Sequence, residues 1–246
     1  MHTINDHIAK DGFRLRGTEM SRIDGFSDVV FGFALTLIVV SLEVPHTYDE
    51  LHKVLVGFVP FAICFVFLIM VWWSHFRFFR RYGLHDIGTI LVNSTLLFTV
   101  LFYVYPLKFL FTLIAAQATG DSNHAFSGPL QQRELMIVYG AGFAAIYFCL
   151  AALYFNAWRQ RHVLRLSPLE TTLTLAYMWG EFGVAAIGVL CCLIAYLVPP
   201  ERAGNAGFAF FIIGVWKTVH GFVAAKRARL AATRTHPKEL LPFSHV

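Results

Sequence analysis

The sequence predicts an all-α integral membrane protein with six transmembrane helices and both termini in the cytoplasm. Of the 246 residues, 57% are hydrophobic and only 14% are charged, whereas a soluble domain carries about a quarter charged residues. The apolar residues form six runs of bilayer-spanning length, and basic residues collect on alternate sides of these runs. We therefore expect the lipid bilayer as the main partner. The net charge of +5 is no argument for nucleic acid, and no nucleic-acid partner is expected.

The first span is predicted over residues 22–44. The preceding 20 residues are polar and have no apolar core, so no cleavable signal peptide is expected, and a short surface helix is predicted around Ile8 to Leu15. Ser21 fits an N-cap, and Asp24 three residues later completes a capping box. Pro45 ends the span. A second span over residues 54–74 ends in a cluster of basic residues, Arg77, Arg80 and Arg81.

Four further spans follow. The third, over residues 87–105, is closed by Pro106, although an extension through residues 109–116 stays open. The fourth covers residues 135–155, after the longest polar loop. Pro168 suits the first turn of a fifth helix, over residues 169–198, and the sixth covers residues 206–225. A basic tail, 226–246, completes what we expect to be a single domain, because no linker or low-complexity segment divides it.

The positions of the basic residues give the orientation. Fifteen Lys and Arg residues lie on the side that holds both termini and the 2–3 and 4–5 loops, against four on the other side. The positive-inside rule then places both termini in the cytoplasm of a multi-pass protein of the cell membrane, inner or plasma.

Metal and redox chemistry have no support in the sequence. The four cysteines lie inside apolar runs, with no CxxC or Cys/His zinc spacing, and they are expected to be packing residues: Cys64, Cys149, Cys191 and Cys192. No metal site and no cofactor are expected.

The cytoplasmic end of the first span carries charges that an anchor helix does not need. Asp28 lies just inside the apolar run, where an unpaired acid costs about 2.5–3.5 kcal/mol. Arg22 is six positions away, on another face of the helix, so the two cannot form an i,i+4 pair. The expected partners lie on neighbouring helices at similar depth: Trp73, His75 and Asn93. Such a cluster would lock this end of the span, although His75 alone could be an ordinary helix-end residue.

An apolar stripe follows along the same helix. At 100° per residue one face collects Phe26, Val30, Phe33, Leu37, Val40 and Val44. Thr36 lies beside it. This stripe suits either a hydrophobic constriction or a helix buried on all sides in its own bundle, and periodicity alone favours the buried helix. Glu43, at the outer end, suits either a cation-concentrating ring or a solvated helix end.

The same stretch resembles a known family. Arg22-x-x-x-Phe26-Ser27-Asp28 matches the RxxxFSD signature of the transmembrane protein 175 potassium-channel family. Residues 72–77, WWSHFR, resemble the end of that family's second span, and residues 93–106 its third. The resemblance covers residues 20–106. A single signature with six spans resembles the prokaryotic members, which assemble as tetramers.

The resemblance implies a homotetrameric channel whose first helices line a central pore permeable to potassium ions. It places the hydrophobic constriction at Phe33, with further apolar layers at Leu37 and Val40 and a selectivity hydroxyl at Thr36. The residues that hold the helix would be Arg22, Phe26, Ser27, Asp28, Trp73, His75 and Asn93. The sequence departs from the family at Phe33, where Ile or Leu is usual.

Two charged residues lie within later spans. Glu181 and Lys217, in consecutive antiparallel helices, are a candidate ion pair that would serve as a brace or in transport. The alternative function is a proton-coupled transporter or a membrane enzyme that uses Asp28, His75 and Glu181. The absence of inverted repeats counts against a transporter, and the absence of a catalytic motif counts against an enzyme. A structural relative without a conducting pore is a third alternative.

Overall fold

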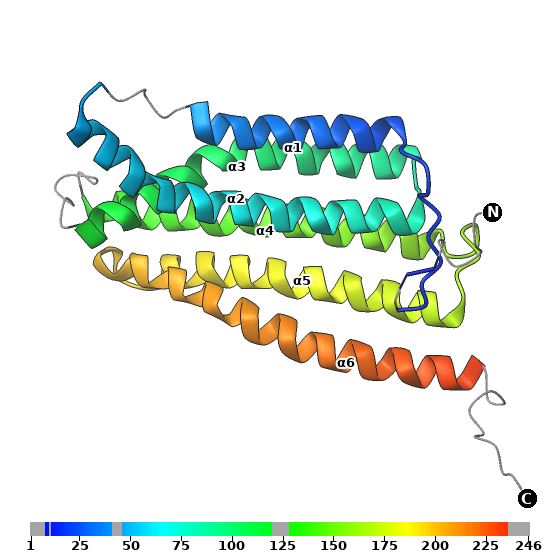
Figure 1. Cartoon of the computed structure of the whole chain (residues 1–246). Helices are drawn as coiled ribbons and strands as arrows, with labels where there is room; N and C mark the ends of the chain where they lie inside the picture. Colours follow the sequence, from blue (N-terminus) through cyan, green and yellow to red (C-terminus); the bar gives the residue numbers. More distant parts are fainter. Residues whose placement is uncertain (1–7, 10, 41–45, 120–127, 236–246) are drawn as a thin grey trace, which may run out of the picture.

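The computed structural model describes residues 8, 9, 11–40, 46–119 and 128–235, and it is helical throughout. The one extended feature in these ranges is an isolated bridge between Ile8 and Arg14. The helices run lengthwise beside one another (Figure 1). They are α1 (Arg22–Val40), α2 (Tyr48–Tyr82), α3 (Ile87–Thr119), α4 (Pro129–Arg159), α5 (Pro168–Leu197), the 3-10 helix η2 (Pro200–Phe211) and α6 (Ile212–Thr235). The predicted all-α class is confirmed.

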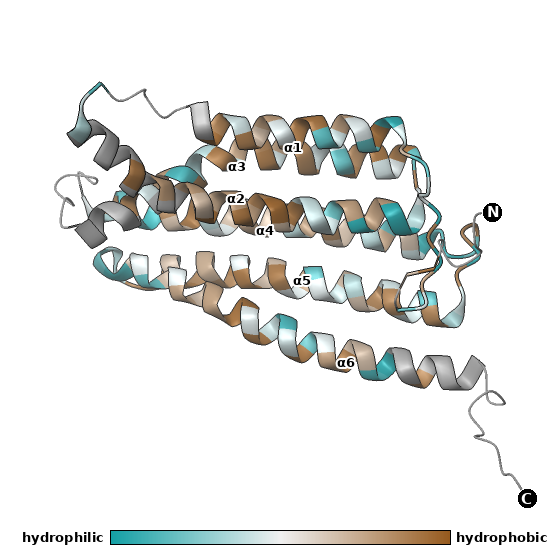
Figure 2. Cartoon of the chain, in the orientation of Figure 1, coloured by the Kyte–Doolittle hydropathy of each residue, from teal (hydrophilic) through white to brown (hydrophobic). Residues whose placement is uncertain are grey.

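Among the residues that the structure describes, five helical segments are long and apolar enough to cross a membrane by length and composition. They are Phe61–Tyr82, Ile87–Leu110, Pro129–Arg159, Pro168–Leu197 and Pro200–Arg227. Hydrophobic residues predominate along the helices, and hydrophilic ones gather toward the end of the bundle where α1 begins (Figure 2). The first 19 residues of the predicted first span, 22–44, form α1, and its last residues, 41–44, lie outside the described part of the chain.

Several predicted boundaries differ from the structure, among them those of α2, which extends beyond the predicted 54–74 at both ends, and the start of α4, predicted at residue 135. Pro106 does not end the third helix but lies inside α3, which continues to Thr119, because neighbouring helices can hold a membrane helix together across a proline. The α6 helix continues to Thr235, so the first part of the expected tail is helical. Residues around Ile8 form no surface helix, since the chain turns at Gly12 with a φ of +80°.

The centre of the bundle is the antiparallel pair of α4 and α5. A Cβ atom at Gly140 would lie 2.7 Å from the Gly188 carbonyl oxygen, and one at Gly188 would lie 2.8 Å from the Gly140 oxygen. Only glycine permits this approach at either position. By contrast, α1 lies at one edge of the bundle and contacts α2 and α3, while α6 lies at the opposite edge against α5 (Figure 1).

The segment before α1 is fastened across the end of the bundle. The Arg16 guanidinium donates from Nη1 and Nη2 to the two Glu170 carboxylate oxygens, at 2.9 Å each. Glu170 also closes the capping box of α5 with Ser167, and Pro168 occupies the first turn as predicted. Asp11 pairs with Arg81 at the end of α2. The chain therefore enters α1 from a fixed position.

Asp86 joins the start of α3 to the end of α4. Its carboxylate accepts a hydrogen bond from Thr89 Oγ1 at 2.6 Å and from Asn156 Nδ2 at 3.2 Å. Burial opposes ionisation of this carboxyl, but the hydrogen bonds from Thr89, Gln160 and Asn156 outweigh it and lower its pKa to about 2. The link therefore stays ionised at any pH above about 4, and acid weakens it only below the ordinary carboxyl range.

Candidate functional site

The inward face of α1 packs against α2 and α3. It carries Ser27, Phe31, Ala34 and Ile38, which are all at most 3% exposed. These positions follow the i, i+4, i+7, i+11 spacing of one helical face. At the N-terminus of this helix, Ser21 Oγ and Asp24 Oδ2 lie 2.8 Å apart, and the backbone N–H of each residue bonds the other's side chain. The predicted capping box is confirmed.

The outward face of α1 carries the predicted apolar stripe. Phe26 is 61% exposed and Phe33 is 64% exposed, while Val30 and Leu37 are half-buried at its margin. The side chain of Val40, and Val44 entirely, lie outside the described residues. The chain therefore does not form a helix buried on all sides, because two of the three phenylalanines of α1, Phe26 and Phe33, are exposed on the outward face.

Thr36 is exposed on the outward side, one turn beyond Phe33. Its Oγ1 donates a hydrogen bond to the Phe33 carbonyl oxygen at 2.8 Å. A hydroxyl has one hydrogen and two lone pairs, so the bond to the backbone uses the hydrogen and leaves oxygen lone pairs for another partner. The arrangement suits coordination of a cation.

A buried chain of hydrogen bonds joins α1 to α2 and α3. His75 Nε2 lies 2.8 Å from Asn93 Oδ1, Asn93 Nδ2 donates to Ser27 Oγ at 2.9 Å, and Ser27 Oγ donates to the Ile23 carbonyl at 2.7 Å. All three side chains are at most 2% exposed. Because the Asn93 oxygen can only accept, this direction of bonds assigns a hydrogen to His75 Nε2. We call Ser27, His75 and Asn93 the helix clamp.

Asp28 is held by α2, but not by the tryptophan that the sequence suggested. Trp72 Nε1 donates to Asp28 Oδ1 at 2.8 Å, whereas Trp73 is 50% exposed. Adjacent helical residues point about 100° apart, so only one of the two indoles can face α1. Arg22 is exposed and makes no hydrogen bond or ion pair with another residue that the structure describes.

A lysine on α3 supports the other end of α1. Lys108 Nζ donates to the Ile38 carbonyl oxygen at 2.9 Å. That carbonyl lies in the last turn of α1 that the structure describes. A cation there also complements the negative end of the helix dipole. The structure thus fixes α1 at both ends.

Sequence reasoning missed Trp72 and Lys108 as residues that hold α1. For Trp72 the sequence did carry a signal, because two adjacent tryptophans stand at the end of the second span. Which of the two indoles faces α1 depends on the rotation of α2 about its own axis. Lys108 follows Pro106, and its role depends on α3 continuing past that proline.

The two charged residues of the later spans share a cavity but form no direct pair. Glu181 on α5 and Lys217 on α6 line the same cavity, and no ion pair joins them among the described contacts. The Lys217 ammonium instead lies 5.6 Å from the centre of the Tyr147 ring. The expected brace is therefore not formed.

In the described ranges no group of three or more His, Cys, Asp or Glu side chains could hold a metal ion. The four cysteines are free, and Cys64 and Cys191 are buried.

Comparison with known proteins connects this geometry to one family. Residues 22–103 match the family model described as "Endosomal/lysosomal potassium channel TMEM175". A potassium channel of Marivirga tractuosa is 32% identical over 228 residues, covering 88% of this chain and 92% of the relative. A potassium channel of Chamaesiphon minutus is 29% identical over 97 residues, which cover 36% of this chain and 48% of that protein.

A solved structure is similar over almost the whole chain. It is the crystal structure of a variant of the potassium channel MtTMEM175 in complex with a Nanobody-MBP fusion protein. The TM-score is 0.78 at 31% sequence identity, and the match covers 89% of this chain and 99% of that one. The similarity therefore includes the three C-terminal helices, which carry no recognisable motif.

Proposed function

The chain belongs to the TMEM175 potassium-channel family, and from that premise we propose that the outward face of α1 lines its potassium pore. The family is one of ion channels and not of enzymes. The proposal places the hydrophobic constriction at Phe33, with Leu37 and Val40 as further layers and the Thr36 hydroxyl as the selectivity group.

The observation that carries the proposal is the exposure of this face while both ends of α1 are fixed. Phe33 projects its ring away from the bundle, and Thr36 keeps oxygen lone pairs free beside it. The helix clamp and the Lys108 bond hold the helix against α2 and α3. A narrow apolar ring can stop ions by excluding water, and nearby oxygen atoms can replace an ion's hydration shell.

One copy of the chain cannot enclose such a pore, because α1 lies at the edge of the bundle. We therefore propose a homotetramer in which four α1 helices surround the pore. All six long helices would cross the cell membrane with both termini in the cytoplasm, as the loop charges indicate. The clamp would then lie at the cytoplasmic end of the pore.

The transporter alternative gains no support from the arrangement of its residues. Asp28 and His75 line one small cavity near the start of α1, while Glu181 lines a different cavity between α5 and α6. A proton pathway through all three would have to cross between these cavities.

Replacing Thr36 by valine should lower the ratio of potassium to sodium flux by about fivefold, because a lost hydroxyl ligand is worth about 1 kcal/mol. Valine keeps the shape of the side chain, so total flux should change less than the ratio. The measurement is flux into proteoliposomes under a potassium or a sodium gradient.

The matched control is Thr95→Val on α3. Thr95 is also exposed and also donates to its own helix, to the Leu91 carbonyl at 2.9 Å, but it lies outside the proposed pore. An unchanged ratio of potassium to sodium flux in the Thr36→Val variant would show that the Thr36 hydroxyl does not contribute to selectivity.

A further inference from the structure

A cavity of about 580 Å³ lies between α5 and α6, at the edge of the bundle opposite α1. The two helices are held together at Trp216, whose Nε1 donates to the Gly180 carbonyl at 3.0 Å. Its indole also rests on Gly183, where a Cβ atom would lie 2.0 Å from the ring. Beyond this contact, toward the end of α6, the helices diverge (Figure 1). Small residues then line the gap, among them Ala176, Gly221 and Ala224.

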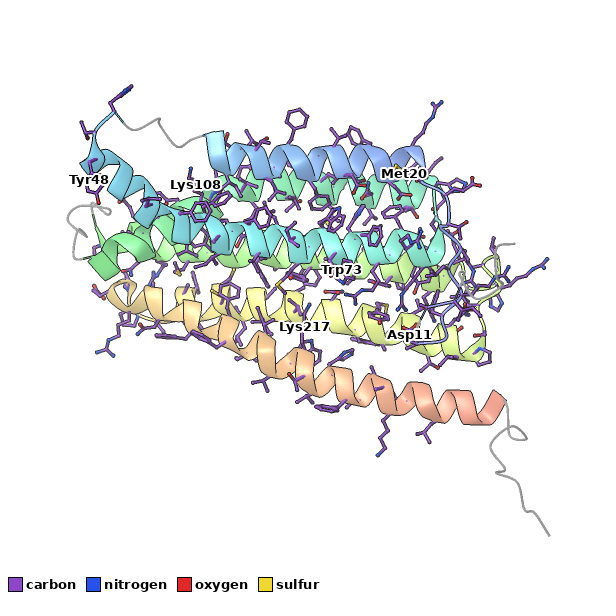
Figure 3. All side chains as sticks on the ribbon, viewed as in Figure 1. Asp11, Met20, Tyr48, Trp73, Lys108 and Lys217 are labelled. Carbon is purple, nitrogen blue, oxygen red and sulfur yellow. The ribbon has the colours of Figure 1, made fainter. Side chains whose placement is uncertain are left out.

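Four charged side chains line the cavity, and one of them, Asp11 in the segment before α1, is already paired with Arg81. Glu181 comes from α5, Lys217 from α6 and Arg77 from α2, and Figure 3 labels Lys217. Glu181 is only 6% exposed, and its Oε2 atom is buried without a hydrogen-bond partner. The two cations are the opposite charges that act on this carboxylate, but neither is in direct contact with Oε2. The cavity therefore leaves a gap between charges of opposite sign.

The charges determine which ligand chemistry fits. A buried carboxylate oxygen without a donor is costly. The Glu181 carboxylate has a hydrogen bond with Ser74, so only its Oε2 atom needs a donor. A simple anion would satisfy Arg77 and Lys217 but leave Oε2 without a donor, and a simple cation would do the reverse. A group that carries both a phosphate and an N–H donor satisfies all three residues.

We propose that this cavity binds a phospholipid with a phosphoethanolamine headgroup, its primary ammonium donating to Glu181 and its phosphate lying against Arg77 and Lys217. Ammonium and phosphate are neighbouring groups in this headgroup, and charge-assisted hydrogen bonds are the strong ones.

The surroundings favour a lipid over a soluble molecule. The cavity opens at the edge of the bundle, and its walls include Leu169, Leu173 and the Trp216 indole. Only 6% of the apolar window in the spanning segment Pro200–Arg227, which joins η2 to the first part of α6, is buried. Large apolar side chains of α6 are exposed, with Phe222 at 75%. A lipid can place its headgroup on the charges and its acyl chains along α6. A volume of this size is typical of ligand pockets.

The test is a binding titration on the detergent-solubilised, delipidated full chain, read by native mass spectrometry. Phosphatidylethanolamine is compared with phosphatidylcholine of the same acyl chains, which keeps the phosphate and the positive charge but has no N–H. The ethanolamine lipid should bind about tenfold more tightly, as expected for a hydrogen bond to a charged group. Glu181→Gln and Lys217→Met should each weaken its binding by a similar factor.

The matched control is Lys226→Met. This variant removes an exposed cation from α6 that does not line the cavity, so it should bind the ethanolamine lipid as tightly as the wild type does. Equal affinity for the two lipids, or wild-type binding by Lys217→Met, would overturn the proposal. If Glu181→Gln does not fold, the Lys217 variant decides alone.

Soluble glycerophosphoethanolamine, which lacks acyl chains, provides a further arm. Binding as tight as that of the lipid would show a free-headgroup site and overturn the lipid assignment. Binding is measured without ion flux, so this result is independent of the proposed pore.

Discussion

Potassium flux should rise by about tenfold or more when Phe33 is replaced by alanine, because lowering the barrier at the constriction by about 1.4 kcal/mol is enough for that change. The Phe33 ring is 64% exposed and makes no contribution to the buried face of α1, so its removal should leave the fold intact. Four missing rings would widen the proposed constriction and allow water to enter it. The measurement is potassium uptake by proteoliposomes.

Phe98→Ala is the matched control for this experiment. Phe98 on α3 is 71% exposed, so its truncation removes an equally exposed ring from a helix that is not proposed to line the pore. Its flux should match that of the wild type. Unchanged flux in a folded Phe33→Ala protein would show that this ring does not restrict the ion path.

Replacing Asn93 by alanine should destabilise the protein by about 2–5 kcal/mol, because it leaves buried His75 Nε2 without its acceptor and removes the hydrogen bond that Ser27 Oγ accepts. Asn93 bonds His75 on one side and Ser27 on the other, and all three are buried. For a chain of this length, the expected fall in Tm is roughly 5–15 °C. Thermal unfolding in detergent, followed by circular dichroism, is the measurement.

Ser94→Ala, at the adjacent exposed position of α3, is the control and should change Tm little. A double-mutant cycle with Ser27→Ala tests the coupling directly. If the clamp acts as a unit, adding Ser27→Ala to the Asn93 variant should cost less than it does in the wild type. Additive losses would mean that the two residues contribute independently.

The parts of the site that lie within one helix could be predicted from the sequence. The capping box at Ser21 and the position of Phe33 and Thr36 on one side of α1 follow from helical spacing alone. Which side of α1 faces outward could not be predicted, because spacing is the same for a buried and an exposed face. The hydrogen bond between Ser27 and Asn93 places the Ser27 face of α1 against α3, so the Phe33 face points outward.

The residues that sequence reasoning placed wrongly or missed depend on how helices rotate and continue. Trp72 bonds Asp28 in place of Trp73 because of the rotation of α2. Lys108 reaches α1 because α3 continues past Pro106. Glu181 and Lys217 do lie in facing helices, but the divergence of α6 from α5 leaves a cavity where a direct pair was expected.

Thiol modification at Thr36 tests the central claim, that the outward face of α1 lines the ion path. The Thr36→Cys variant is treated in proteoliposomes with a cationic methanethiosulfonate reagent, and potassium flux is compared before and after. Val215→Cys, on the 65% exposed outer side of α6, is the control, and the wild type shows any effect at the native cysteines.

A fixed positive charge in a narrow pore should lower flux by at least about tenfold, with no change for Val215→Cys or the wild type. Undiminished flux through a Thr36→Cys protein whose modification is confirmed by mass would contradict the account.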